Sequence, residues 1–178
     1  MKLFRRRPAL PAASQPPLEA EERVIAWCPA APPDGPEQPL VATNRGIWLP
    51  GATERLGWHE IHKAAWSGRE LRITPAEVAE ERDGYTVLVD GPVTSFLLLA
   101  PGEVPDQVRS RVSRSVAYTT HHTLERGAVR VVGRRVSGQD GLTWTVRYDS
   151  GTPVDRAGVR ESTDELVDAA QNSVAPPP

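Results

Sequence analysis

Short apolar runs separated by turn residues fill residues 40–74 of the chain. The dipeptides Asn44-Arg45 and Ser67-Gly68 interrupt these runs, and asparagine and glycine both accept the left-handed backbone that a tight turn needs. Short runs between such turns are typical of antiparallel strands that follow one another along the chain. The pattern therefore predicts two hairpins with one strand between them, the strands being at residues 40–43, 46–49, 54–58, 63–67 and 69–74.

Two further pairs of strands are expected downstream. Residues 85–90 and 93–99 are rich in β-branched and aromatic side chains and are bounded by turn residues, which predicts that they form a strand pair. Residues 128–136 and 142–148 alternate between apolar and polar positions on either side of a glycine-containing linker, which predicts a β-hairpin. The acidic residues 75–84 fit either a solvated turn or a polar strand, and the dipeptide Asp83-Gly84 at their end indicates a hairpin turn.

The N-terminal part of the sequence predicts one strand and two stretches outside the sheet. Residues 1–18 are rich in Pro, Ala and Arg without periodicity, so we expect them to be disordered. The first strand is predicted at residues 22–28, where side chains alternate between two faces. Residues 29–39 are rich in proline, which lacks the backbone N–H that a strand inside a sheet donates, and we expect a stiff loop there.

Valine recurs at every fourth position at Val104, Val108, Val112 and Val116, which places one apolar stripe along an amphipathic helix. We expect this helix between residues 105 and 118, with a proline in its first turn, where the missing N–H is not needed. Valines are poor helix formers because their side chains are stiff. The helix should therefore need a sheet to dock on.

A second, short helix is predicted at residues 162–173. Ser162 and Glu165 have the three-residue spacing of a capping box, which satisfies free backbone N–H groups at the start of a helix. Leu166, Ala169 and Ala170 give it a small apolar face.

Length and composition fit one domain with tails. The chain has 178 residues, enough to bury a hydrophobic core, and its net charge of −2 indicates neither a nucleic acid nor a strongly acidic partner. The single cysteine, Cys28, excludes an intrachain disulfide and fits a reducing compartment. No apolar run approaches the roughly 18 residues of a membrane-spanning helix, and the N-terminus lacks the apolar core of a signal peptide. We therefore expect a cytoplasmic protein.

The run LVATNRGIWL at residues 40–49, then WHEI at 58–61 and AxW at 64–66, followed by the valine-striped helix, resembles the bacterial PH-like (pleckstrin homology-like) domains. It is similar in particular to small PH-like proteins of high-GC bacteria, over residues 22–118. The resemblance implies an α+β, mainly β fold: a PH-like split barrel of two packed antiparallel sheets capped by an amphipathic helix. The extra β-hairpin and the short C-terminal helix follow this unit.

These expectations divide the chain into four parts. We expect a disordered basic leader at 1–18, the PH-like domain at 19–124, and a β-hairpin extension of the same domain at 125–150. A linker, a short acidic helix and a disordered tail are expected at 151–178.

PH-like folds serve widely as scaffolds for protein contacts, so the resemblance implies a non-enzymatic interaction or scaffold module that binds a protein partner. PH domains that bind phosphoinositides use basic residues around the first hairpin, whereas residues 29–39 contain Asp34 and Glu37 and no base. Recognition of a lipid head group is therefore not implied. The alternative function is a peripheral adaptor at the inner face of the membrane, and an unrecognised enzyme is the third.

The polar side chains form no recognisable catalytic or metal-binding motif. His59 and His62 lack the four-residue spacing of a zincin helix, and no cysteine is near them in sequence. Ser113 and Ser115 are expected on the surface, and the sequence has no GxSxG, GxxxxGK[ST] or GxGxxG motif. The sequence thus indicates no catalytic residue, metal, cofactor or small-molecule substrate.

Three of the five tryptophans, Trp48, Trp58 and Trp66, lie in the predicted meander of strands. They could line a ligand groove, but large rings on strands more often fill the core. We therefore expect all three in the core.

Two groups of basic residues are the candidate binding surfaces. A leader group would give weak, salt-sensitive attraction to an anionic bilayer, and it comprises Lys2, Arg5, Arg6 and Arg7. A helix group flanks the valine stripe and is the candidate surface for a protein partner; it comprises Arg109, Arg111 and Arg114. A solvated tail and a solvated helix face are the simpler interpretations.

A third basic group, Arg130, Arg134 and Arg135, is expected at a strand edge, where charge discourages pairing with other chains. Nucleic acid is disfavoured as a partner, because the chain outside the leader is acidic and lacks exposed aromatic residues between its basic ones.

Overall fold

The computed structural model describes residues 9–174, in which eleven strands and two α-helices form an α+β, mainly β fold, as the sequence predicted. The strands are β1 (Val24–Ala31), β2 (Gln38–Thr43), β3 (Gly46–Trp48), β4 (Leu56–Gly57), β5 (Ile61–Trp66), β6 (Glu70–Arg82), β7 (Tyr85–Asp90), β8 (Thr94–Leu98), β9 (Val116–Thr123), β10 (Ala128–Arg134) and β11 (Thr143–Tyr148). The helices are α1 (Val104–Ser115) and α2 (Ala157–Val174), with single 3₁₀ turns η1 (Ala12–Ser14) and η2 (Trp58–Glu60).

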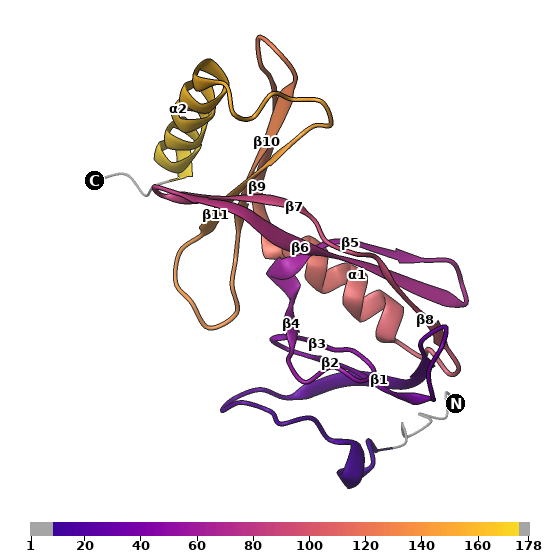
Figure 1. Ribbon diagram of the computed structural model, residues 1–178. Coiled ribbons are helices and arrows are strands. Elements are labelled where there is room, and N and C mark those ends of the chain that lie inside the picture. The colour runs from indigo at the N-terminus through magenta and orange to yellow at the C-terminus, as the bar shows by residue number, and fades with distance from the viewer. Residues whose placement is uncertain (1–8, 175–178) are drawn as a thin grey trace, which may run out of the picture.

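The strands lie side by side in the order β4-β3-β2-β1-β8-β6-β7-β11-β10-β9, and β5 pairs with β6 beside this path (Figure 1). Neighbouring strands run antiparallel, except that β7 and β11 pair in parallel, with Thr145 opposite Thr86 and Val146 opposite Val87. The two ends of this order do not pair, so within residues 9–174 the sheet is not closed.

The long strand β6 joins the two halves of the molecule (Figure 1). Its first part pairs on both sides, with Leu71 opposite Trp66 of β5 and opposite Phe96 of β8. Its second part pairs with β7, where Val78 lies opposite Leu88. The acidic segment is therefore a polar strand, which is one of the two structures expected for it.

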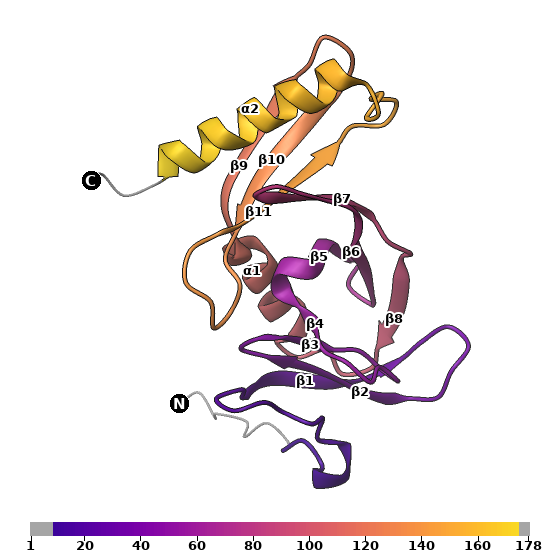
Figure 2. The same ribbon diagram turned by 60° about the vertical axis from the view of Figure 1, so that its left-hand side comes forward.

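Helix α1 packs against the strands of the N-terminal half. It contacts β1, β2, β5 and η2, and it lies within the curve of these strands in Figure 2. Val104 and Val108 are fully buried, and Val112 packs against the same core. The predicted docking of the valine stripe on a sheet is thus confirmed. The fully buried large side chains around these valines are Leu40, Ile47, Ile61, Leu71 and Ile73.

The predicted helix is too long at its C-terminal end. It stops at Ser115, and Val116 begins β9, which pairs with β10 along its length. Residues 116–123 are rich in β-branched and aromatic side chains, which favour a strand once a neighbouring strand is present. The fourth valine of the stripe therefore belongs to the sheet and is only partly buried.

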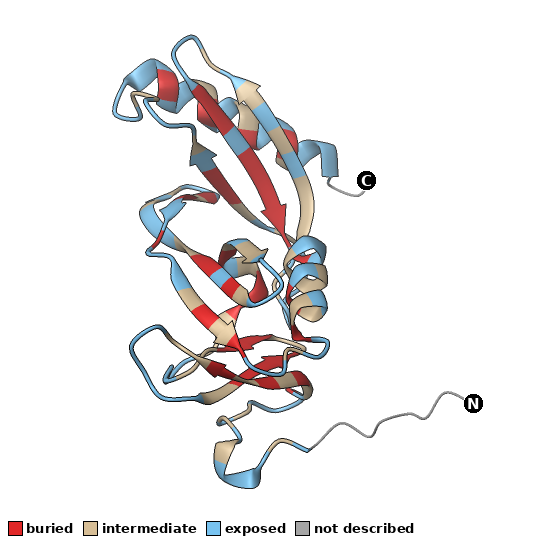
Figure 3. Ribbon diagram, turned by 90° about the vertical axis from the view of Figure 1, so that its right-hand side faces the viewer, coloured by how far each residue is buried: buried red, intermediate tan, exposed pale blue. Residues whose placement is uncertain are grey.

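Helix α2 covers the sheet of the C-terminal half, and Figure 3 shows the buried stretch along β10. Its buried residues include Val167 and Ala170, which pack with Val129 and Val131 of β10. The prediction of a short helix at residues 162–173 is wrong in length, because burial of Val159 brings the preceding residues into the same helix. Neither helix, nor any other helix among residues 9–174, has the length and apolar character needed to span a membrane.

Arg82 anchors α2 to the sheet. Its guanidinium lies 5.7 Å from the ring centroid of Tyr85 and 5.9 Å from that of Tyr148, and it donates hydrogen bonds to both hydroxyl groups, at 2.9 and 3.0 Å. The Tyr85 hydroxyl donates to Asp164 of α2, and the Tyr148 hydroxyl donates to Thr163 of the same helix. Two tyrosines thus connect the arginine to the helix.

The loop predicted at residues 29–39 is shorter than expected: residues 32–37 form it, whereas residues 29–31 and 38–39 belong to β1 and β2. β1 continues through Pro29 to Ala31, and Pro29 lies opposite Pro39 of β2. The Pro29 carbonyl points toward Leu99 and away from β2, so the N–H that Pro29 lacks is not needed for the pairing of β1 with β2. The Pro29 carbonyl accepts a hydrogen bond from the Leu99 amide at 3.0 Å.

Residues 85–90 and 93–99 form strands as predicted, but the prediction that they pair with each other is wrong. β7 pairs with β6 and β11, whereas β8 pairs with β6 and β1. The two strands take different parts of β6 because that strand is long enough to span both halves of the molecule.

Trp48 and Trp58 are buried, as predicted, at 8% and 4% exposure. Trp66 is 37% exposed, so its predicted place in the core is wrong. It lies at the end of β5, which pairs with β6 alone among the described strands, and an edge position leaves one side of its ring to solvent.

Candidate functional site

A cleft of about 420 Å³ lies at the C-terminal end of α1. Its lining comes from three places: the end of α1, the turn between β2 and β3, and the loop between β10 and β11, which extends beside α1 in Figure 2. We call this cleft the arginine groove. The polar and charged lining residues that define it are Asn44, Arg111, Arg114, Ser115, Arg135, Ser137, Gln139 and Asp140.

The valine stripe determines where the arginines of α1 lie. Since Val104 and Val108 face the core, Arg111 and Arg114 fall on the flank of the helix that borders the groove. Arg114 is also in the last turn of α1, where a positive charge is favourable beside the negative end of the helix dipole.

The groove is cationic. Its lining contains three arginines, Arg111, Arg114 and Arg135, against one carboxylate, that of Asp140. The Arg111 Nε is buried and has no hydrogen-bond partner among residues 9–174. Burial, and then the charges of Arg114 and Arg23, lower the pKa of the Arg111 guanidinium. A guanidinium nevertheless stays protonated in a protein, so a positive charge without local compensation faces this cleft.

A buried carboxylate supports the N-terminal side of the groove. Glu22 is 8% exposed and accepts hydrogen bonds from Thr43 Oγ1 at 2.7 Å and Trp48 Nε1 at 3.2 Å, and it forms an ion pair with Arg55 at 2.6 Å. Burial raises the pKa of Glu22, but these hydrogen bonds and one from the Glu19 amide outweigh it, so the pKa lies below its usual value. The carboxylate is therefore charged at neutral pH.

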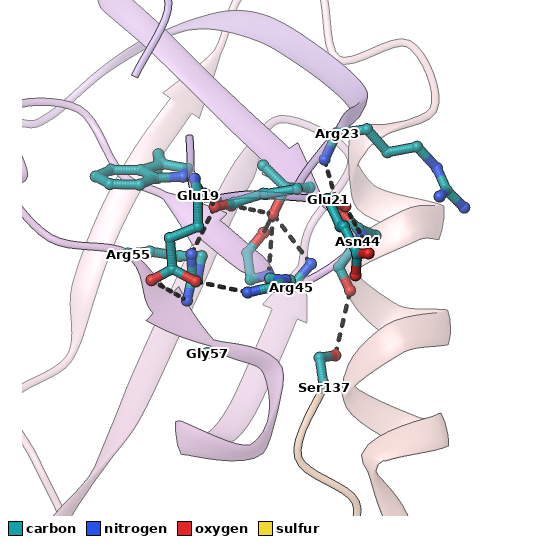
Figure 4. A network of polar contacts seen from close by, with 12 residues as sticks. Glu19, Glu21, Arg23, Asn44, Arg45, Arg55, Gly57 and Ser137 are labelled. Atoms are coloured by element: carbon teal, nitrogen blue, oxygen red, sulfur yellow. Dashed lines mark hydrogen bonds and ion pairs between the residues drawn. The ribbon is translucent and has the colours of Figure 1, made fainter. Parts of the chain in front are cut away.

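The β2–β3 turn is held from two sides, as Figure 4 shows. Asn44 Oδ1 accepts a hydrogen bond from the Arg23 amide at 2.7 Å, and Asn44 Nδ2 donates to the Glu21 carbonyl at 3.1 Å. Ser137, in the β10–β11 loop, donates to the Asn44 carbonyl at 3.3 Å. These contacts fix two of the three walls of the groove relative to each other.

The structure brings together two of the three arginines expected on the partner surface. Arg111 and Arg114 line the groove, whereas Arg109 is exposed on α1 outside the lining. The leader group lies outside residues 9–174 and is not described by the structure; it comprises Lys2, Arg5, Arg6 and Arg7.

Two expectations about polar residues near this site are wrong. Ser115 is not on the surface but 5% exposed, and its hydroxyl donates to the Val112 carbonyl at 2.7 Å and accepts from Arg134 at 2.8 Å. Arg134 does not guard an edge, because β10 lies between β9 and β11 and the side chain is buried. Asn44 and Arg135 were not predicted as site residues, since only the folded chain brings the β2–β3 turn beside the β10–β11 loop.

Two histidines outside the groove lie in pairs with aspartates. Within residues 9–174 no group of three or more His, Cys, Asp and Glu side chains is arranged to hold a metal ion. His62 Nδ1 lies 2.8 Å from Asp90 Oδ1, and His121 Nε2 lies 2.9 Å from Asp149 Oδ2. Burial raises the pKa of the Cys28 thiol to about 11, so this thiol is protonated and a weak nucleophile at neutral pH.

We expect the fold to lose stability as the pH falls below 6.5, through His59 and His62. Burial is the main cause that lowers the pKa of both imidazoles from the ordinary 6.5. The unfolded chain then binds protons more readily than the folded chain, so the free energy of unfolding decreases as the pH falls from about 7.5 to about 5.5. Urea unfolding across this range measures the effect.

A double variant, His59→Gln with His62→Gln, should flatten this profile. The matched control is Arg126→Gln, because it introduces the same glutamine at an exposed position without removing an imidazole and should leave the slope as it is. A wild-type profile that is already flat between these pH values contradicts the prediction.

The groove offers positive charge and hydrogen-bond donors from the end of α1, the β2–β3 turn and the β10–β11 loop. Comparison with protein-family models, curated proteins and solved structures gave no match. The chemistry follows from the lining itself, because the planar guanidinium groups of Arg111, Arg114 and Arg135 match the geometry of carboxylate and phosphate oxygens. The arrangement is suited to binding an anionic group.

Proposed function

We propose that this chain is a non-enzymatic PH-like interaction module of the cytoplasm that binds an acidic segment of a protein partner in the arginine groove. The observation that carries the proposal is the buried Nε of Arg111, which has no partner in the described part of the chain and lies between cationic neighbours. A buried donor without a partner is costly, and an incoming carboxylate would satisfy it.

The strand order supports the PH-like part of the proposal. The path β4-β3-β2-β1-β8-β6, continued by β5, forms two antiparallel ribbons that are joined where Ala30 of β1 lies opposite Leu98 of β8. Helix α1 packs inside the curve of these ribbons, as the amphipathic helix of a split barrel would. The second part of β6, with β7, β9–β11 and α2, adds a further layer to this unit.

The shape of the groove favours a protein segment over a membrane surface. The β10–β11 loop stands beside α1, so the arginines lie in a concave site of about 420 Å³ and not on a flat face. Acidic side chains on an extended segment can enter such a site, whereas a bilayer presents a broad flat surface. The excess of three arginines over one carboxylate would also steer an acidic segment toward the groove.

We expect a fluorescent oligoglutamate peptide of about eight residues to bind the wild-type protein with an affinity that falls as salt is added. The double variant Arg111→Gln with Arg114→Gln should bind it roughly tenfold or more weakly, because each lost charge-assisted hydrogen bond is worth about 1.5–3 kcal/mol. Fluorescence anisotropy measures both affinities.

The double variant Arg69→Gln with Arg126→Gln is the matched control, since both arginines are exposed in turns, between β5 and β6 and between β9 and β10, and their replacement removes two charges elsewhere. An oligolysine peptide of equal length should not bind. Equal affinity of the wild-type and double-variant proteins, or no wild-type binding at low salt, overturns the proposal.

A further inference from the structure

A second cationic cleft, of about 290 Å³, lies between β5 and the face of the β9–β11 sheet. We call it the β10 cleft, and it shares no lining residue with the arginine groove. Its polar and charged lining residues are His62, Thr119, Arg130, Arg134, Thr145 and Arg147.

The register of β10 collects the arginines of this cleft. Arg130 and Arg134 are four residues apart on one strand, so their side chains leave the same face of the sheet. Arg147 of β11 lies opposite Arg130 in the strand ladder, which places its side chain on that face as well. Three guanidinium groups therefore converge on one small volume.

Within residues 9–174, Arg134 is a buried charge without a counter-ion. The residue is 8% exposed, and its guanidinium donates to the uncharged hydroxyl of Ser115 at 2.8 Å. No carboxylate of residues 9–174 forms an ion pair with it, and burial lowers the pKa of the Arg134 guanidinium. Buried charges are normally paired, because an isolated one loses its hydration without compensation.

The Asp90 carboxylate contacts two lining residues of the cleft, His62 and Arg147. Asp90 accepts from Arg147 Nη2 at 2.7 Å and lies 2.8 Å from His62 Nδ1. Burial, the largest cause, lowers the pKa of His62, so this imidazole adds no charge at neutral pH. Three arginines against one carboxylate leave an excess of two positive charges beside the cleft.

We propose that the β10 cleft binds a phosphate group, free or carried by a small organic molecule, with Arg134 and Arg130 as its main ligands and Arg147 beside them. The excess charge matches a dianion, and guanidinium groups bind phosphate oxygens in pairs. A volume of about 290 Å³ is at the lower end for ligand pockets, so it suits a small ligand and not a protein segment. The inference goes beyond the proposed function, and either can fail without the other.

Thermal unfolding in inorganic phosphate, against chloride of equal ionic strength, tests the proposal. We expect phosphate to raise the wild-type Tm in a concentration-dependent manner, because a ligand that binds only the folded state stabilises it. Arg134→Met should keep or raise the Tm in chloride, since it removes an unpaired buried charge, and it should abolish the increase in phosphate. If Arg134 had only a structural role, Arg134→Met would lower the Tm in both chloride and phosphate.

Isothermal titration with phosphate measures the site directly, and Arg130→Gln should weaken binding roughly tenfold. Arg130 is exposed, so this variant is expected to fold even where Arg134→Met does not. The matched control, Arg69→Gln, removes an exposed charge in the turn between β5 and β6 and should bind phosphate as the wild type does. If glycerol phosphate binds more tightly than inorganic phosphate, the ligand is a phosphate group carried by an organic molecule. Equal affinities would identify free phosphate as the ligand.

Two results overturn the inference. One is a wild-type Tm that is the same in phosphate and in chloride, with no heat of binding. The other is a phosphate response of Arg130→Gln and Arg134→Met equal to that of the wild type, which would locate the binding outside the β10 cleft.

Discussion

Replacement of Trp58 by alanine is expected to lower the free energy of unfolding by about 3–5 kcal/mol. The ring is 4% exposed and belongs to the core that α1 closes. Its Nε1 donates a hydrogen bond to the Thr43 carbonyl at 3.1 Å. Truncation would leave both a cavity and a buried carbonyl without its donor. Denaturant unfolding followed by fluorescence or circular dichroism measures the loss.

Trp66→Ala is the matched control for this prediction. The same side chain is removed, but Trp66 is 37% exposed at the end of β5 and leaves no closed cavity. We expect a loss on the order of 1 kcal/mol. Equal losses for the two variants would contradict the assignment of Trp58 to the core and of Trp66 to the edge.

The hairpins could be predicted because their signals are local. Gly68 and Gly84 both have positive φ, at 91° and 79°, in the turns that join β5 to β6 and β6 to β7. Glycine adopts this conformation without steric cost, so the dipeptides Ser67-Gly68 and Asp83-Gly84 are sufficient evidence of a turn. The flanking strands then follow from their apolar residues.

Strand partners depend on contacts that no short window of sequence contains. β7 has the β-branched residues of a strand, yet nothing within it indicates that its second neighbour is β11, in parallel and far along the chain. Likewise, Pro29 is compatible with a strand because the N–H that it lacks is not needed between β1 and β2. Local propensity predicts that an element exists, and packing of the two cores decides what it pairs with.

One missed strand explains why the candidate sites were only partly predicted. When residues 116–118 are assigned to the helix, β9 is lost and β10 becomes an edge, where Arg134 is a plausible guard against aggregation. With β9 in place, β10 is an interior strand and Arg134 becomes a buried charge. Arg111 and Arg114 were found because helical periodicity is a local signal.

Replacement of Glu22 by alanine is expected to lower the free energy of unfolding by about 3–5 kcal/mol. The carboxylate receives hydrogen bonds from Thr43 and Trp48 and pairs with Arg55, and its side chain has 0% exposure. Its removal leaves Arg55 without its ion pair, and it leaves the Thr43 and Trp48 donors without the acceptor that satisfies them in the wild-type protein. The loss should also depend on pH, which separates it from a simple loss of packing.

The sign of that dependence follows from the lowered pKa of Glu22. A carboxyl group whose folded pKa is below 4.5 stabilises the fold above 4.5, and this contribution is lost as the pH falls through the folded value. The difference between the wild type and Glu22→Ala should therefore be largest near neutral pH and shrink in acid. Glu19→Gln is the control, because Glu19 pairs with Arg45 and Arg55 at the surface and should matter little. A constant difference across this range would show that the charge of Glu22 contributes nothing, although Thr43, Trp48 and Arg55 all bind it.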